Sequence, residues 1–130
     1  MTPTCQLLRE LISIPSVNPA FLPPRDPHAG EKNVGDFLAA TAAQAGLDVE
    51  FQEVFPQRSN LLARLAPREQ PRHRVLLAPH LDTVGGSPLR DVIFQPVLRG
   101  ERWYGRGACD TKGSVAAMMS ALLHVARSGR

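Results

Sequence analysis

The residues that could carry chemistry begin with a histidine and an aspartate two positions apart, His80 and Asp82, directly after an apolar stretch. In extended backbone their side chains leave the same side of the chain, about 6.5 Å apart. The imidazole can then bind a metal ion through one nitrogen, while the carboxylate holds the other N–H and fixes the tautomer. Taken alone, the pair also fits a histidine that is simply hydrogen-bonded in a turn.

A second acidic group, Asp110, lies in the glycine-rich residues 104–113, just before an expected helix. Backbone N–H groups and the helix dipole favour an ionised carboxylate there, and its two oxygens could bridge two cations. The plainer interpretation is a helix-entry residue. Neither phosphate-binding glycine pattern fits, because Lys112 precedes Gly113 and Asp110 occupies a position that needs glycine. Gly113 itself suggests a close backbone approach.

The other groups with reactive side chains receive plainer interpretations. No histidine is adjacent in sequence to Cys109, which favours a buried, inert thiol over a nucleophile or a soft metal ligand. The remaining histidines lie in polar loops or on an expected helix, and we interpret them as surface or packing residues: His28, His73 and His124.

Three helices are expected to position these groups. The first has Thr4 as its cap, carries one leucine and isoleucine stripe, and ends at Pro15. The second covers residues 31–45, where apolar residues recur at i, i+3 and i+4, and Gly46 stops it. The third is capped by Ser114.

The segments between the helices predict a loop and several strands. Proline breaks up residues 13–30, which we expect to form a long surface loop of the kind that is often functional. Residues 74–79 are apolar without alternation, as in a central strand covered on both faces. His80 and Asp82 would then stand at its carboxyl end, where open α/β sheets bind ligands. Further strands are expected at residues 47–54, 60–65, 93–98 and 102–104, which makes the fold class α/β.

Composition limits the function classes. The 130 residues, 43% hydrophobic and 21% charged, predict one globular domain or a piece of one. The net charge of +3 comes from scattered arginines without interleaved aromatics, so we expect no nucleic-acid partner. Two distant cysteines indicate neither a disulfide framework nor a zinc knuckle, which favours a cytoplasmic setting. Neither a leader nor an apolar run of about 20 residues is present, so we expect no membrane partner.

Together the two motifs, thirty positions apart, resemble the zinc-dependent amidohydrolase and peptidase family that includes acetylornithine deacetylase, succinyl-diaminopimelate desuccinylase and glutamate carboxypeptidase. The similarity extends to the Leu-Ile-Ser-Ile-Pro-Ser-Val-Asn-Pro of residues 11–19, to Phe94 and Pro96, and to residues 104–108. It covers nearly the whole chain.

The resemblance implies a role for each candidate residue. His80 is then a metal ligand, Asp82 the catalytic carboxylate that supports it, and Asp110 a ligand bridging both metals. The implied cofactor is two zinc ions, with cobalt or manganese as alternatives. The implied substrate is a small N-acyl amino acid or peptide, whose amide bond is cut by a metal-activated water.

The implied fold is a three-layer α/β/α catalytic domain of zinc-exopeptidase type with a mostly parallel mixed sheet, interrupted by a smaller lid domain through which the full-length protein could form a homodimer. Residues 1–130 are expected to form only the first part of that catalytic domain. The family's tandem glutamates, a general base and a ligand, have no counterpart here, so we expect the 130 residues to be inactive alone. The alternative is a non-catalytic α/β binding or scaffold module that keeps the fold without the metal.

Overall fold

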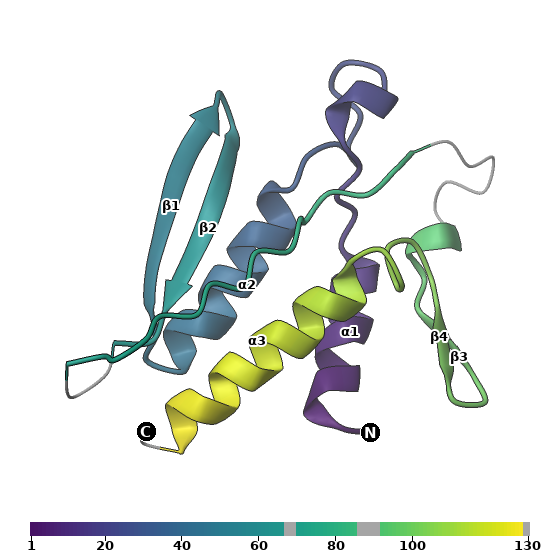
Figure 1. Ribbon diagram of the computed structural model, residues 1–130. Helices are drawn as coiled ribbons and strands as arrows, with labels where there is room; N and C mark the ends of the chain where they lie inside the picture. Colours follow the sequence, from purple (N-terminus) through teal and green to yellow (C-terminus); the bar gives the residue numbers. More distant parts are fainter. Residues whose placement is uncertain (67–69, 86–91, 129–130) are drawn as a thin grey trace.

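The computed structural model describes residues 1–66, 70–85 and 92–128 (Figure 1). Within these ranges two α-helices are followed by two β-hairpins and a third α-helix, which confirms a mixed α and β composition. In chain order the elements are α1 (Pro3–Ser13), the 3-10 helix η1 (Pro19–Phe21), α2 (Lys32–Gln44), β1 (Asp48–Phe55), β2 (Arg58–Arg64), the 3-10 helix η2 (Val92–Phe94), β3 (Val97–Arg99), β4 (Arg102–Tyr104) and α3 (Lys112–Arg127).

The cap of helix α1 lies two residues before the predicted one. The side chain of Thr2, and not that of Thr4, accepts a hydrogen bond from the Cys5 backbone N–H at 3.3 Å. Pro3 then occupies the first turn, where its missing N–H costs nothing because that N–H would have no partner in the helix. The helix ends before Pro15, as predicted, and one face is buried through Leu7, Leu11 and Ile12.

Helix α2 ends close to the predicted point, and Gly46 follows it with a φ of +77°, which favours glycine. Helix α3 starts two residues before the expected cap at Ser114. Its backbone continues directly from the glycine turn, because the Lys112 N–H already donates to the Gly107 carbonyl at 2.8 Å. Thr111 takes the cap position without a side-chain capping bond.

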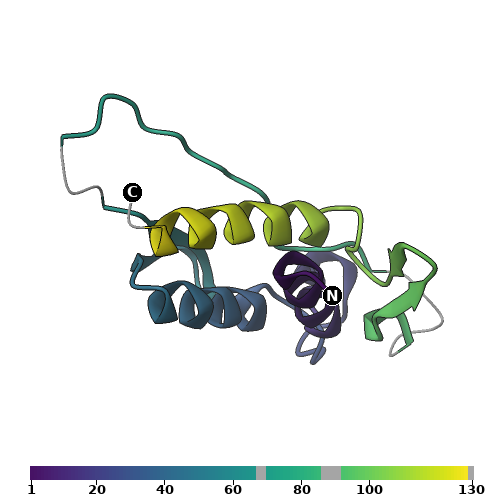
Figure 2. The same cartoon turned by 90° about the horizontal axis from the view of Figure 1, so that it is seen from below.

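The core lies where the three helices meet. Helix α3 packs on α1, while α2 packs on the β1–β2 hairpin, and Figure 2 shows α3 lying over the other two helices. The buried cluster draws on all three helices and on the residue before β1: Leu7, Leu11, Val34, Leu38, Ala42, Leu47, Val115, Ala116, Met119 and Leu123. Removal of apolar surface from water is the dominant favourable term in folding, so we expect this cluster to be the main source of stability.

The two hairpins confirm most of the predicted strands. Strands β1 and β2 pair antiparallel, with Val49 opposite Ala63. Strands β3 and β4 pair antiparallel around Gly100, whose φ is +60°. The strand predicted over residues 93–98 is shorter than expected, because its first residues belong to the 3-10 helix η2.

The predicted central strand at residues 74–79 is wrong for this structure. These residues run as a single extended trace (Figure 1) and join no ladder within the described part of the chain. The side chains of Val75 and Leu76 are 85% and 84% exposed. An apolar sequence reports a tendency to be buried, but a strand forms only where a neighbour accepts its backbone hydrogen bonds. The described residues accordingly contain two antiparallel sheets and none of the expected parallel sheet.

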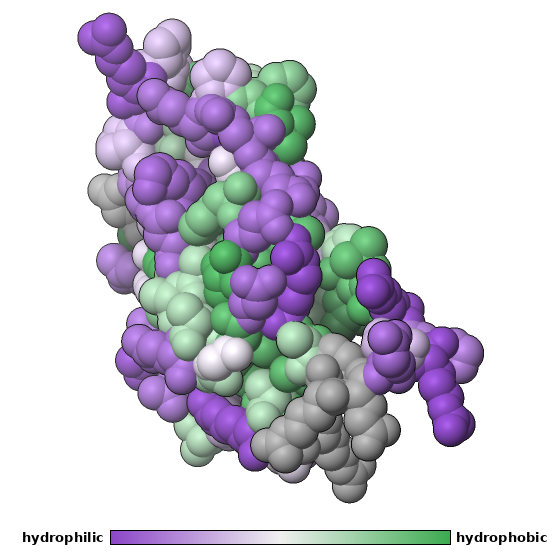
Figure 3. All heavy atoms as spheres, turned by 90° about the vertical axis from the view of Figure 1, so that its left-hand side faces the viewer, coloured by the Kyte–Doolittle hydropathy of each residue, from purple (hydrophilic) through white to green (hydrophobic). Residues whose placement is uncertain are grey.

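The hairpin side of the molecule also carries exposed apolar groups. Figure 3 looks onto this side and shows hydrophobic areas between hydrophilic margins. Phe51, Val54 and Phe55 of β1 are among the exposed large hydrophobic residues, so β1 is less well covered than its alternating pattern predicted. Within the described ranges, none of the helices is long and apolar enough to cross a membrane.

Candidate metal centre

The loop after α1 reaches into the site instead of lying over the surface as predicted. Ser16 and Val17 are buried, and Val17 forms isolated parallel bridges with Ala29 and Thr83. The Thr83 N–H donates to the Ser16 carbonyl at 2.8 Å, and the Asn18 N–H donates to the Thr83 carbonyl at 2.9 Å. The proline-rich loop therefore fixes the backbone that immediately follows His80.

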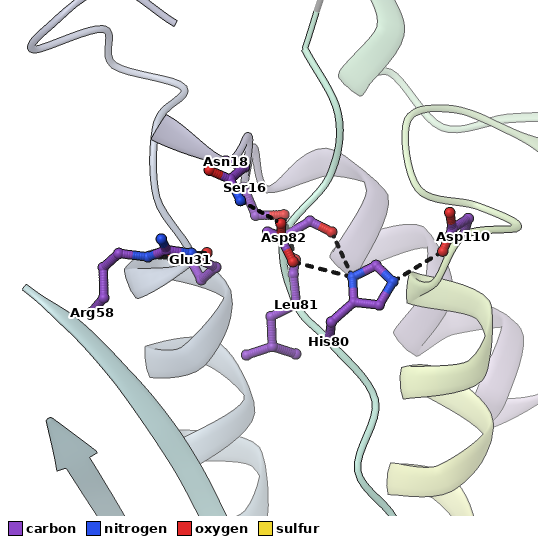
Figure 4. Close-up of polar contacts among 8 residues, drawn as sticks. All are labelled: Ser16, Asn18, Glu31, Arg58, His80, Leu81, Asp82 and Asp110. Atoms are coloured by element: carbon purple, nitrogen blue, oxygen red, sulfur yellow. Dashed lines mark hydrogen bonds and ion pairs between the residues drawn. The ribbon is translucent and has the colours of Figure 1, made fainter. Parts of the chain in front are cut away.

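Figure 4 shows the imidazole of His80 between two carboxylates. Its Nδ1 lies 3.2 Å from Asp82 Oδ1 and 3.0 Å from the Asp82 carbonyl oxygen, while Nε2 lies 3.0 Å from Asp110 Oδ1. Both neighbours of Nδ1 are acceptors, so Nδ1 carries a proton. The structure thus brings all three sequence-selected residues together, with Asp82 on the nitrogen that faces away from Asp110.

The surrounding charges favour a cation at this place. Burial lowers the pKa of His80, but the hydrogen bond with Asp110, the Asp82 carbonyl and the charges of both carboxylates outweigh burial and raise the pKa above its ordinary value. A proton on Nε2 then bridges to Asp110. A metal ion held by the same two atoms would take the place of that proton.

Asp110 reaches the histidine from a tight turn. Residues 105–111 contain two glycines with positive φ, +152° at Gly105 and +80° at Gly107, before α3 begins. The expected close approach at Gly113 is confirmed, since a Cβ there would lie 2.6 Å from the Ala108 carbonyl oxygen. The Asp110 side chain is 85% exposed, which leaves its second oxygen open to solvent.

Lys112 is the buried charge that the sequence analysis missed. Its side chain is 1% exposed, and Nζ donates to the Ile14 carbonyl at 2.6 Å. Burial lowers the pKa of Lys112 to about 8. The sequence signal for this burial is Gly107. A Cβ at this position would lie 3.0 Å from Cδ of Lys112, so the glycine leaves room for the lysine side chain.

A pocket of about 550 Å³ opens beside the three residues. The turn before α3 and the β3–β4 hairpin supply much of its wall, together with apolar side chains such as Val92 and Ile93. Cys109 lines this pocket and is exposed, so the predicted buried thiol is wrong: the turn carries its side chain toward solvent. No glutamate from the described ranges lines the pocket.

An ion pair between Arg58 and Glu31 lies on the side of Asp82 that is opposite His80 (Figure 4). Arg58, at the start of β2, donates through Nε and Nη2 to Glu31, at the start of α2 (Figure 4). The hydrogen bond that Arg58 donates to Glu31 raises the pKa of Arg58, burial opposes this, and the charges of Glu31 and Asp82 add to the rise. Arg58 thus places a fixed positive charge on the side of Asp82 away from the histidine.

The residues present fit part of a metal site. Two ligands of one tetrahedral zinc ion stand about 3.3 Å apart when each bond is about 2.0–2.1 Å, close to the 3.0 Å between His80 Nε2 and Asp110 Oδ1. Zinc needs more ligands than these two. Across residues 1–66, 70–85 and 92–128, no group of three or more histidine, cysteine, aspartate or glutamate side chains is arranged to hold a metal.

Comparison with known proteins gives consistent matches. Residues 76–130, which include all three candidate residues, match the model described as peptidase family M20/M25/M40. A peptidase M20 domain-containing protein of Schizosaccharomyces pombe is 38% identical over 77% of this chain, and the succinyl-diaminopimelate desuccinylases of Gluconacetobacter diazotrophicus and Variovorax paradoxus are each 36% identical, over 99% and 92% of it. The chain spans 24%, 31% and 30% of the lengths of these relatives.

Proposed function

The chain belongs to peptidase family M20/M25/M40, as its motifs predicted, and we propose that it supplies one side of a metal-dependent site that hydrolyses an amide or peptide bond. The observation that supports this most is the His80 imidazole held between Asp82 and Asp110. Its Nδ1 is occupied by acceptors, so the neutral ring offers the Nε2 lone pair toward Asp110. His80 and Asp110 are the proposed metal ligands, and Asp82 supports His80.

Each side chain has a defined task in the proposed site. A bound divalent cation, zinc in this proposal, supplies the charge that polarises an amide carbonyl and acidifies water. Asp82 orients the imidazole and raises its basicity as a ligand. Asp110, with one oxygen toward His80 and the other open, can reach a second cation. The apolar side chains of the pocket wall beside them would contact a bound substrate.

We further propose that the rest of the catalytic machinery lies outside these 130 residues. The chain spans about a third or less of the relatives it matches, and its pocket lining includes no glutamate from the described ranges. In the complete protein the exposed apolar residues 74–79 would take the central place in a parallel sheet of zinc-exopeptidase type. The substrate class we propose is an N-acyl amino acid or peptide, in keeping with relatives named succinyl-diaminopimelate desuccinylase.

The test of this proposal is a zinc titration. Zinc is added to the metal-free chain, and binding at His80 is monitored by NMR. We expect zinc to shift the His80 ring signals, and we expect His80→Ala and Asp110→Asn to weaken zinc binding, measured for every variant by calorimetry, at least about 10-fold. His124→Ala is the matched control, because His124 is exposed on α3. Unchanged affinity in His80→Ala would remove this residue from the site and would favour a non-catalytic module.

A second assay addresses catalysis. The 130-residue chain, incubated with zinc and N-acyl amino acids, should show no hydrolysis at an ordinary enzymatic rate of about 1 per second or more. Turnover at such a rate would show that the general base lies within the chain after all. In a full-length protein that contains this chain, His80→Ala should abolish activity and leave the fold nearly intact.

A further inference from the structure

The side chain of Asn18 is fixed at both of its ends. Its Oδ1 accepts a hydrogen bond from the Ala20 N–H at 3.0 Å, and its Nδ2 donates to Asp82 Oδ2 at 2.9 Å (Figure 4). Because a backbone N–H can only donate, the oxygen of the amide must face Ala20. The amino group is thereby turned toward Asp82.

Asp82 uses its two oxygens for two different partners. Oδ2 accepts from Asn18, while Oδ1 lies 3.2 Å from His80 Nδ1. A carboxylate group is planar, so a hydrogen bond that fixes Oδ2 also fixes the position of Oδ1. The hydrogen bond from Asn18 to Oδ2 therefore also fixes Oδ1, the oxygen that lies against His80 Nδ1.

The backbone that carries His80 depends on the same loop. Residues 74–79 join no ladder in the described structure, so no sheet holds the segment on its N-terminal side. On its C-terminal side, the Ser16 hydroxyl donates to the Leu81 carbonyl at 2.8 Å, and Ser16 and Asn18 pair with Thr83. Residues 16–18 thus contact each of the three residues that follow the histidine.

We propose that Asn18 is a positioning residue of the metal centre, which holds the Asp82 carboxylate so that the imidazole of His80 keeps Nε2 toward Asp110. The expected effect on metal affinity rests on the proposed function. The contact between Asn18 and Asp82 does not depend on it. The Asn18 side chain makes its hydrogen bonds with Asp82 and the Ala20 N–H and not with His80 or Asp110, so its side chain acts on the metal ligands through Asp82.

The discriminating variant is Asn18→Ser. A serine oxygen can still cap η1 at Ala20, as serine does at many helix starts, but it is too short to reach Asp82. Asn60→Ser is the matched control, because Asn60 is exposed on β2. Both variants are also made in an Asp82→Ala background, which gives a double-mutant cycle.

Two readouts are measured by NMR at one fixed pH. In the metal-free chain, exchange of the His80 Nδ1 proton with water should be about 10-fold faster in Asn18→Ser, as expected for one lost hydrogen bond to a charged group. The zinc dissociation constant at His80 should rise about 10-fold. Asn60→Ser should change neither, and Asn18→Ser should add nothing once Asp82 is alanine, which a merely structural role would not predict.

An exchange rate equal to wild type, or an equal effect in both backgrounds, would overturn the positioning role. If exchange responds while zinc leaves His80 unshifted in a full-length protein that contains this chain, the proposed metal function fails and the positioning role stands. If Asn18→Ser does not fold, exchange of the Asn18 side-chain amide is compared between wild type and Asp82→Ala. It should be about 10-fold faster without the carboxylate, and equal rates would overturn the inference.

Discussion

Lys112 makes the stability of the chain depend on pH in a direction that can be worked out. Its pKa is about 8 in the folded chain, against an ordinary value of 10.5, because its ammonium group is buried. Between these values the unfolded chain binds a proton that the folded chain has released. Stability therefore rises with pH across this window. At about 1.4 kcal/mol per pKa unit, burial of the charge costs about 3 kcal/mol at neutral pH.

The perturbation is Lys112→Met, which keeps an unbranched side chain and removes the charge. Between pH 7 and pH 9.5 the free energy of unfolding of wild type should rise by about 2 kcal/mol of these 3 kcal/mol. The variant has no amine to titrate and should show no such rise. The variant also leaves the Ile14 carbonyl without its donor, which costs about 1–3 kcal/mol at every pH. The stability difference between the two proteins should therefore shift by about 2 kcal/mol in favour of wild type as pH rises.

The assay is urea unfolding at several pH values between these limits, in the presence of a chelator. Lys32→Met is the matched control, because the Lys32 side chain is 72% exposed and pairs with Asp36, and its curve should run parallel to wild type. Thiols and other titrating groups cancel in each comparison, since all variants share them. Parallel curves for Lys112→Met and wild type would refute the reasoning and show that the buried amine does not change protonation on folding.

Three further changes test the packing and charge around the site. Asp110→Asn should lower the pKa of His80 measured by NMR, because it removes the side-chain partner that contributes most to raising it; an unchanged value would mean that the two side chains do not meet in solution. Gly105→Ala should destabilise the chain by about 1–3 kcal/mol in thermal unfolding, because a Cβ there would lie 2.3 Å from Ile12 Cγ2, and a neutral effect would contradict this contact. Leu11→Ala, at a fully buried position, should cost about 3 kcal/mol in urea unfolding, and a loss below about 1 kcal/mol would place Leu11 outside the core.

The three helices were the most predictable part of the fold. Each buries a stripe of apolar residues spaced at three and four positions, and this spacing is read directly from the sequence. Their starts were less predictable, since Pro3 moved α1 upstream and the Gly107 turn led straight into α3. Local turn geometry decides these boundaries, and residue spacing does not describe it.

Residues 74–79 show where apolar composition stops being informative. Their side chains favour burial, but whether they form a strand depends on a neighbour that can pair with them. No described segment does so. The same limit applies to Cys109 and Lys112, whose exposure and burial follow from how one tight turn directs their side chains.

For the candidate site, the sequence alone determined the groups and the family: a histidine and an aspartate on one side of extended backbone, and an aspartate in a turn before a helix. Only the tertiary structure decided how they meet. It set Asp82 on Nδ1 and Asp110 on Nε2 of one ring, and it brought Asn18 from a distant loop against Asp82. The physical reason is that chemistry belongs to side chains, whereas the distances between them are set by packing of segments that lie far apart in the chain.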